Sequence, residues 1–234
     1  MTGNVPPAAK IAPPSLWKAA GELRVLLDLG RATVIRRRPR RRARGEPVLV
    51  VPGFATSDAA TALLRDHLDA AGFDVHTWNL GINRGPRGDV MRRLSCRIRS
   101  IARRTRRRVR IVGWSLGGLM ARAVAGRLPQ HVARVVALGS PLTADPDASH
   151  LSRLYAWLGG TPSDSRSVRA LVRASHRAPV TSIYSRSDGV VAWEASAGAP
   201  GECRAVEVDA THLGLVANPD VLEVVAREVA RDPD

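Results

Sequence analysis

The amino-acid sequence predicts a protein of the α/β class, with one mostly parallel β-sheet of about six strands and helices on both faces. Short apolar runs alternate with stretches of helical periodicity, which is typical of βαβ units. The first run, at 48–51, is apolar at every position, as strands buried on both faces are. A length of 234 residues suits a single core of this kind.

The first 46 residues are expected to lie outside this domain. Residues 1–14 are rich in Pro and Ala and predict a disordered tail, and Ser15 is placed to cap an amphipathic helix that reaches Val34. The arginine run at 36–44 is interrupted by Pro39 and is too charged to pack, so we interpret it as a linker. We therefore expect the folded domain to occupy residues 47–234.

Within that domain the predicted elements alternate in chain order. Strands are predicted at 48–51, 73–78, 109–112, 132–138, 180–184 and 204–208. Helices are predicted at 58–71, around the stripe of Val90, Leu94, Ile98 and Ile101, at 116–128 and at 219–231. Asp58 and Asn218 are the expected N-caps of the first and last of these helices, and Gly72 the end of the first. Residues 148–175 predict a short, polar, helical insertion.

The composition is ordinary for a globular protein except for its charge. No apolar run approaches the ~18–20 residues needed to cross a bilayer, and residues 1–17 lack the pattern of a secretory signal. We therefore expect a cytoplasmic protein in which Cys96 and Cys203 are buried free thiols, with a single disulfide between them as the alternative. The formal net charge is +15, and all but two of the 36 Lys and Arg residues are arginines, which is typical of a genomic codon bias.

The sequence Gly113-Trp114-Ser115-Leu116-Gly117 matches the pattern G-x-S-x-G between a predicted strand and a predicted helix. A serine at the tip of a sharp strand-to-helix turn needs a strained backbone, and side chains two residues away on either side would clash there. The pattern arises by chance in roughly one chain of this length in ten, so its context carries the argument. We interpret Ser115 as a nucleophile rather than as part of an ordinary glycine-rich turn.

A serine hydroxyl needs a base, and His212 is the candidate. It lies in a loop just past the last predicted strand, where the chain order Ser…Asp/Glu…His puts the histidine. The ordinary alternative is a structural or surface loop histidine. The other histidines occupy less suitable positions, in a helix, a strand, a turn or the insertion and its end: His67, His76, His131, His150 and His176.

Asp188 is the candidate acid that would orient the imidazole. It lies in the loop after the predicted strand at 180–184, which is the position required by the chain order. Asp145, after the preceding strand, is the rival acid. The ordinary interpretation of Asp188 is a turn residue before Gly189, since Asp-Gly pairs are common in turns.

An oxyanion needs two backbone N–H donors. We expect one from Leu116, directly after the nucleophile, and the other from Phe54, in the loop after the strand at 48–51. The ordinary interpretation of Pro52-Gly53 is a plain turn. No metal-ligand spacing is present, so the sequence predicts neither a metal nor a cofactor.

These motifs, together with Gly139-Ser140-Pro141 and Thr211-His212-Leu213-Gly214, occur in the order found in α/β-hydrolase lipases and esterases. Over residues 47–231 the chain resembles the small bacterial lipase/esterase members of that superfamily. The resemblance implies the α/β-hydrolase fold and a triad of Ser115, Asp188 and His212. Many relatives have His-Gly where this chain has Pro52-Gly53, a departure that bears on the second oxyanion donor.

The expected function is hydrolysis of a small-molecule or lipid carboxylic ester through an acyl-Ser115 intermediate. The same residues would also serve an amidase, a thioesterase or an acyltransferase. An apolar stripe in the insertion, which fits a lid and ordinary packing equally well, consists of Leu151, Leu154, Trp157 and Leu158.

The basic residues suggest a second property. At 15–44 an amphipathic helix adjoins the arginine run, which predicts weak association with an anionic membrane and a location peripheral to it. The arginines at 92–110 are interpreted as the solvated face of a core-packing helix. Neither stretch has interleaved aromatic residues or a nucleic-acid-binding motif, which argues against nucleic acid as a partner.

Overall fold

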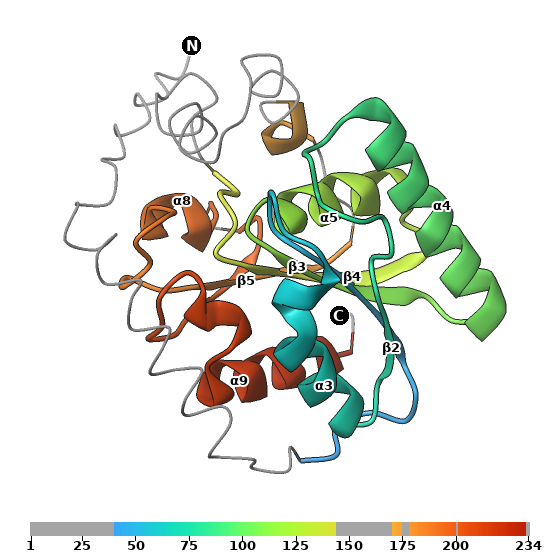
Figure 1. The fold of residues 1–234 in the computed structure, drawn as a ribbon, viewed down its shortest axis with the longest axis horizontal. Coiled ribbons are helices and arrows are strands. Elements are labelled where there is room, and N and C mark those ends of the chain that lie inside the picture. The colour runs from blue at the N-terminus through green and yellow to red at the C-terminus, as the bar shows by residue number, and fades with distance from the viewer. Residues whose placement is uncertain (1–39, 144–169, 175–177, 200, 233–234) are drawn as a thin grey trace, which may run out of the picture.

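The computed structural model describes residues 40–143, 170–174, 178–199 and 201–232, and these residues form one parallel sheet covered by helices (Figure 1). The strands are β1 (Pro47–Val51), β2 (Asp74–His76), β3 (Val109–Trp114), β4 (Val132–Leu138), β5 (Val180–Tyr184) and β6 (Arg204–Glu207). They lie in the order β2-β1-β3-β4-β5-β6, and every neighbouring pair is parallel. The predicted fold class is confirmed.

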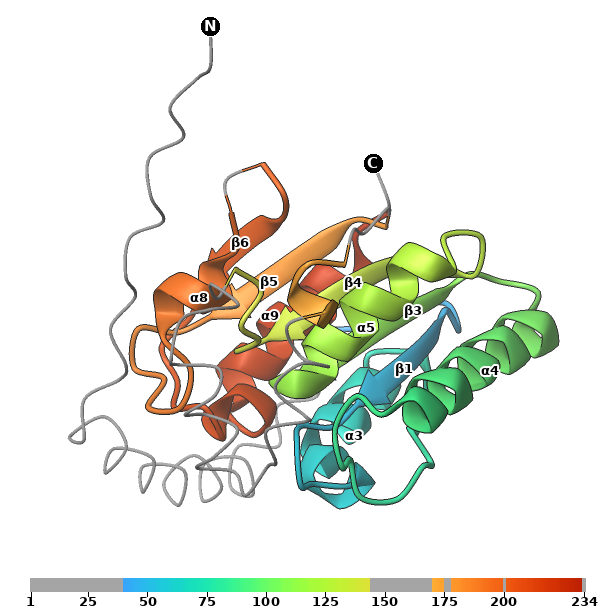
Figure 2. The same cartoon turned by 90° about the horizontal axis from the view of Figure 1, so that it is seen from above.

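The helices lie on both faces of this sheet. They are η2 (Asp58–Thr61), α3 (Ala62–Ala70), α4 (Gly88–Thr105), α5 (Leu116–Arg127), α8 (Trp193–Ala197), η3 (Gly214–Val216) and α9 (Pro219–Ala230). Figure 2 shows α4 and α5 on one side of the strands, with α3 and α9 on the other. Among the described residues, no helix combines the length and apolar character that crossing a bilayer requires.

Alternation along the strands divides the interior into two cores. Leu49 and Val51 of β1 pack with α4 and α5, whereas Val48 and Val50 pack with α3 and α9. All four side chains are fully buried, because each face of a central parallel strand is covered by helices. The predicted stripe of α4 supplies the first core, with Leu94, Ile98 and Ile101 fully buried.

The parallel arrangement brings the carboxyl ends of distant strands to one edge. Val51 pairs with Gly113, Trp114 with Leu138, and Leu138 in turn with Ile183. The loops after β1, β3, β4 and β5 therefore start at nearly the same level. Ligand sites of open parallel α/β sheets lie outside this edge.

Asp58 does not cap the first helix as predicted. Its carboxylate accepts hydrogen bonds from the backbone N–H groups of Trp78, at 2.8 Å, and Asn79, at 3.0 Å. Ser57 caps η2 instead, accepting from Ala59 N–H. A carboxylate has several acceptor sites, and here they stabilise the loop after β2 rather than the helix N-terminus. The cap at Asn218 is as predicted, because its side chain accepts from Asp220 N–H at 3.0 Å.

The described end of the arginine-rich segment is packed, which differs from the expectation for a linker. The N–H groups of Arg42 and Ala43 donate to Ala71 O, and Gly45 N–H donates to Gly72 O. Ala43 is buried, and the Arg42 guanidinium pairs with Glu223 of α9. The expectation for residues 42–45, which was based on the charge of the segment alone, is therefore wrong. Glu223, far along the chain, neutralises Arg42.

The cysteines and one helix also differ from the expectations. Both cysteines are free, but Cys96 is exposed on α4 rather than buried, and Cys203 is half-buried. Helix α8 has no counterpart among the predicted elements. The tail and helix predicted before residue 40 lie outside the described residues, as does most of the predicted insertion at 148–175.

Candidate active site

Ser115 occupies a strained turn between β3 and α5. Its backbone angles are φ 55° and ψ −123°, in a region that residues with a side chain rarely adopt. Two hydrogen bonds hold it there: Ser115 N–H donates to Leu138 O at 2.8 Å, and the Ser140 hydroxyl donates to Ser115 O at 2.7 Å. Strain of this kind persists only where surrounding contacts enforce it, and here β4 and the loop after it supply them.

The glycines of the motif allow close backbone packing around this turn. A Cβ atom at Gly113 would collide with the backbone of Gly118 in the first turn of α5. A Cβ atom at Gly117 would lie 2.5 Å from the carbonyl oxygens of both Val51 and Pro52. The first turn of α5 therefore rests directly on the end of β1, and the clashes predicted for larger residues at 113 and 117 are confirmed.

Asp188 lies in the loop between β5 and α8, with almost no exposure to solvent. Its Oδ1 atom accepts hydrogen bonds from the N–H groups of Val190 and Val191, both at 2.8 Å. The Oδ2 atom is thereby directed to the other side, where it lies 2.7 Å from Nδ1 of His212. The carboxylate is 3% exposed, so its partners rather than water satisfy it.

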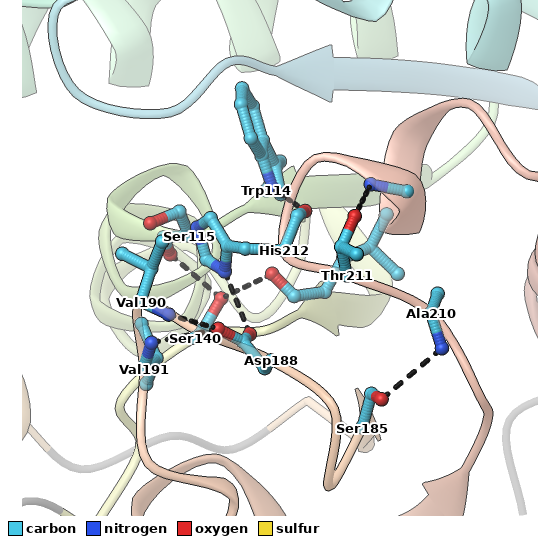
Figure 3. Close-up of polar contacts among 12 residues, drawn as sticks. Trp114, Ser115, Ser140, Ser185, Asp188, Val190, Val191, Ala210, Thr211 and His212 are labelled. Atoms are coloured by element: carbon cyan, nitrogen blue, oxygen red, sulfur yellow. Dashed lines mark hydrogen bonds and ion pairs between the residues drawn. The ribbon is translucent and has the colours of Figure 1, made fainter. Parts of the chain in front are cut away.

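His212 lies in the loop between β6 and η3 and is 4% exposed. Its backbone carbonyl accepts a hydrogen bond from the indole N–H of Trp114 at 3.1 Å, and the two rings lie 5.5 Å apart between centroids. Trp114 immediately precedes Ser115, so this contact holds the imidazole beside the strained turn. Figure 3 shows the ring next to Ser115, with Nδ1 turned towards Asp188.

Two loops meet below the imidazole, and Ser185 joins them. Its hydroxyl accepts from Ala210 N–H at 3.2 Å and from Ser187 N–H at 3.0 Å, which links the loop of His212 to the loop of Asp188. Gly139, with φ +54°, forms the floor of the pair. A Cβ atom there would lie 3.0 Å from Asp188 Oδ2 and 3.1 Å from His212 Nδ1, so a larger residue would press on their hydrogen bond.

The two predicted oxyanion donors, Leu116 and Phe54, belong to the two segments that meet at Gly117, which are the start of α5 and the loop after β1. Leu116 opens α5, and the first N–H groups of a helix have no acceptor within it. Phe54 lies in the loop directly after β1 and packs against the α4/α5 core. Because Gly117 brings the carbonyls of Val51 and Pro52 against the helix start, both predicted donors belong to adjacent backbone segments.

Asn83 fixes this loop, and the sequence did not predict it. Its amide Nδ2 donates to Pro52 O at 2.8 Å, while its own backbone accepts from Ala55 N–H and donates to Thr56 O, both at 2.8 Å. The side chain is completely buried. Asn83 therefore holds the chain on both sides of Phe54, and a lone Asn in a loop gave no sequence signal for such a contact.

The other predicted residues lie elsewhere. His67 on α3 faces Glu223, with 3.4 Å between Nε2 and Oε2, and His76 in β2 lies 3.0 Å from Asp74. His131 precedes β4 at the amino edge of the sheet, away from Ser115. The remaining histidines and the rival acid lie outside the described residues, namely His150, His176 and Asp145.

Burial lowers the pKa of both His67 and His76, although the neighbouring carboxylates of Glu223 and Asp74 act in the opposite direction. They lie on α3 and β2, respectively, outside the loops that carry Ser115, Asp188 and His212. Within the described ranges no group of three or more His, Cys, Asp or Glu side chains is arranged to hold a metal ion.

Comparisons with known proteins agree with the architecture. The family model for the alpha/beta hydrolase fold matches residues 104–188, a segment that includes both Ser115 and Asp188. A search of curated proteins found no match.

Solved structures extend the likeness over most of the chain. Lipase B of Aspergillus fumigatus has a TM-score of 0.58 at 20% identity, over 81% of this chain, which spans 53% of the lipase. Monoacylglycerol lipase of Paleococcus ferrophilus has a TM-score of 0.57 at 19% identity, over 80% of this chain and 94% of that one. The mature lipase BlEst2 of Bacillus licheniformis has a TM-score of 0.60 at 15% identity, over 80% and 92%. At such identities the likeness establishes the fold.

Proposed function

We propose that this chain, which has the α/β-hydrolase fold, is a serine hydrolase that cleaves carboxylic esters through an acyl-Ser115 intermediate. The observation that carries the proposal is the buried hydrogen bond between Asp188 and His212, which lies beside a serine held in a strained turn. A buried Asp–His pair next to a nucleophile is the arrangement that acyl transfer to serine requires.

In the first half-reaction the Ser115 hydroxyl oxygen attacks the ester carbonyl. The Nε2 atom of His212 takes the hydroxyl proton, and Asp188 stabilises the resulting imidazolium through Nδ1. The hydrogen bonds from Val190 and Val191 to Asp188 keep Oδ2 directed at the ring. Collapse of the tetrahedral intermediate transfers the proton from His212 to the departing alcohol and leaves the acyl group on Ser115.

In the second half-reaction water attacks the acyl-enzyme, with His212 again acting as the base. Each tetrahedral intermediate carries a negative oxygen, which the N–H groups of Leu116 and Phe54 would stabilise. Losing one such donor typically costs roughly 10²–10³ in rate. Asn83 would act as a positioning residue in both steps, because it anchors the loop that contains Phe54.

The solved structures that share this fold favour an ester as the substrate. The three structures compared above are named as lipases, among them a monoacylglycerol lipase. A series of nitrophenyl esters of increasing acyl length would define the acyl group that the site accepts.

The rate should decline as the solution is acidified below about pH 6, because a protonated imidazole cannot act as the base. A flat profile down to about pH 4 would contradict a histidine base.

The deciding experiment is covalent labelling with a fluorophosphonate probe. The wild-type chain should be labelled at a single site, and Ser115→Ala should abolish labelling and lower kcat by about 10⁴–10⁶. The matched control is Ser100→Ala, which removes a hydroxyl from α4 rather than from the turn between β3 and α5. Persistent labelling of the Ser115 variant would show that another residue is the nucleophile.

A further inference from the structure

The outer face of α4 and the loop before it carry a dense positive charge. Residues 84–108 include eleven arginines and a single acidic residue, Asp89. The exposed members are Arg84, Arg87, Arg92, Arg93, Arg99, Arg103, Arg104, Arg106, Arg107 and Arg108. We refer to these ten side chains as the α4 basic face. An 18-residue helix is about 27 Å long, so the charge extends along one flank of the domain.

Among the described residues, the α4 basic face makes internal contacts at its C-terminal end, where Arg107 donates to Arg44 O and Arg108 to the carbonyl oxygens of Pro129 and Val132. Within the described part of the chain, its one ion pair is the 3.7 Å contact between Arg107 and Glu46. Arginines elsewhere are used internally: Arg186 pairs with Glu207 and Arg204 with Glu228. A codon bias explains why the basic residues are arginines, but it does not explain why exposed ones gather along α4 and the loops at its two ends.

Buried arginines of the sheet also have a structural use. Arg110 donates to Val229 O at 2.9 Å, and Arg134 donates to Glu228 O at 2.8 Å. Both carbonyls belong to the last turn of α9, whose oxygens have no acceptor role within the helix. These cations stabilise the negative end of α9, so they leave no positive charge at the surface. The unbalanced charge of the described residues therefore lies mainly on α4.

An exposed apolar side chain adjoins this charge. Ile82 is 54% exposed in the loop between β2 and α4, two residues before Arg84. Among the described residues the other large exposed apolar side chain is Leu213, 40% exposed, which directly follows His212. Ile82 directly precedes Asn83, whose side-chain amide donates to Pro52 O in the loop that contains Phe54. The two exposed apolar side chains therefore belong to loops that also contain Asn83 and His212.

We propose that the α4 basic face, with Ile82 as an apolar anchor, binds the surface of an anionic phospholipid bilayer. Guanidinium groups are attracted by anionic headgroups within about one Debye length, and an exposed aliphatic side chain gains by entering the interface. A nucleic acid would use the arginines but offers no apolar surface for Ile82, and the face has no aromatic side chain on which bases could stack. Lipid is therefore the partner that uses both features.

Such binding would deepen the proposed function, on which this consequence rests. Ile82 and Leu213 are the sequence neighbours of Asn83 and His212 in the candidate site, so a bilayer that contacts Ile82 would lie close to the loops of that site. The substrates would then be esters carried by membrane lipids. Binding itself requires no catalysis, so Ser115→Ala should bind vesicles as well as the wild-type chain does.

The test is sedimentation of the full chain with two kinds of vesicle, one of phosphatidylcholine alone and one of an equal mixture with phosphatidylglycerol. We expect binding to the anionic vesicles alone, and a steep loss of binding as salt is raised. The double variant Arg92→Glu/Arg93→Glu should weaken binding by roughly tenfold or more, and Ile82→Ser should weaken it without any change in the net charge of the chain. Thermal melts of both variants should match the wild-type melt, because the side chains are exposed.

The matched control is Arg40→Glu/Arg41→Glu, which makes the same charge change in the exposed end of the arginine-rich segment at 36–44. Loss of binding in this variant with full retention in the α4 variant would overturn the proposal. Equal binding to neutral vesicles would also overturn it, as would binding to a DNA duplex at a salt concentration that abolishes binding to anionic vesicles. Loss of vesicle binding with unchanged hydrolysis of soluble nitrophenyl acetate would separate this proposal from the proposed chemistry.

Discussion

The Nδ1 atom of His212 lies 2.7 Å from Oδ2 of Asp188, and less than a twentieth of either residue is exposed. Twenty-four residues separate them in the chain, and they arrive on loops that follow two neighbouring strands, β5 and β6. The second oxygen of the carboxylate is occupied by two backbone N–H groups. The bond is thereby restricted to one geometry, which makes it the most informative single contact to alter.

Replacing Asp188 by Asn should lower kcat by roughly 10⁴ while leaving the fold intact. The amide keeps the size of the carboxylate but cannot stabilise an imidazolium, and it favours the wrong tautomer of His212. The measurement is steady-state hydrolysis of a nitrophenyl ester. Asp209→Asn is the matched control, since Asp209 is exposed and bonded to Ser187 rather than to the imidazole. Comparable losses in both variants would remove Asp188 from the proposed chemistry.

Replacing Asn83 by Leu should lower kcat by roughly ten- to a hundredfold with little change in KM, because the loop that carries Phe54 would lose its anchor. The free energy of unfolding should fall by about 1–3 kcal/mol, since Pro52 O would be left without its donor. The positioning role predicts slower fluorophosphonate labelling but an unchanged acid limb of the pH–rate profile. A loss of stability with no change in kcat would reduce Asn83 to a structural residue.

Replacing Gly117 by Ala should impair both folding and activity. The new methyl group would lie 2.5 Å from the carbonyl oxygens of Val51 and Pro52, so α5 and the loop after β1 must separate. Overpacking of this kind typically costs about 1–3 kcal/mol of unfolding free energy. Gly88→Ala is the matched control, because a Cβ atom there meets nothing within 4 Å and alanine favours the helix. Both free energies can be measured by denaturation in urea.

Stability should decline as the pH falls from about 7 to 5, in part through His67 and His76. Burial lowers the pKa of each in the folded state, whereas in the unfolded chain the pKa of both is about 6.5. Below that value the unfolded chain binds more protons, so the stabilising contribution is complete above it and is lost as the pH falls through the folded pKa. Urea denaturation at several pH values would show this.

The matched variant for the pH experiment is His67→Gln/His76→Gln, in which neither side chain titrates. Its free energy of unfolding should depend less steeply on pH over the same interval. An undiminished slope would mean that other groups account for the acid sensitivity. Asp74 and Glu223 remain in this variant, so the comparison isolates the two imidazoles.

Much of the fold could be predicted because its signals are local. The bounds predicted for β4 and β5 are those observed, and the cap at Asn218 is present. The predictions were wrong where a side chain binds a group that is distant in the sequence instead of one nearby. Asp58 was expected to cap its own helix, but its carboxylate binds the backbone after β2 instead. Arg42 was expected in an unpacked linker, but Glu223 of the last helix neutralises it.

The candidate site divides in the same manner. The sequence indicated Ser115, Asp188 and His212 because each has a local mark: a glycine pattern, a loop after a strand, and a place in the chain order. It gave no indication of Asn83, and it marked Gly139 only as part of the Gly139-Ser140-Pro141 motif, because the contacts that give both residues their importance are with groups 31 and more positions away. Such contacts leave no periodicity or spacing in a single sequence.

By itself the sequence determined a parallel α/β sheet and the chemical types of its candidate residues, since apolar periodicity and turn chemistry act within a few neighbouring residues. Only the tertiary structure decided that the Asp188 carboxylate faces the imidazole, that Asn83 anchors the loop after β1, and that Arg42 pairs with Glu223. Each of these depends on which distant segments become neighbours when the strands align, and that choice is made by the packing of the whole sheet.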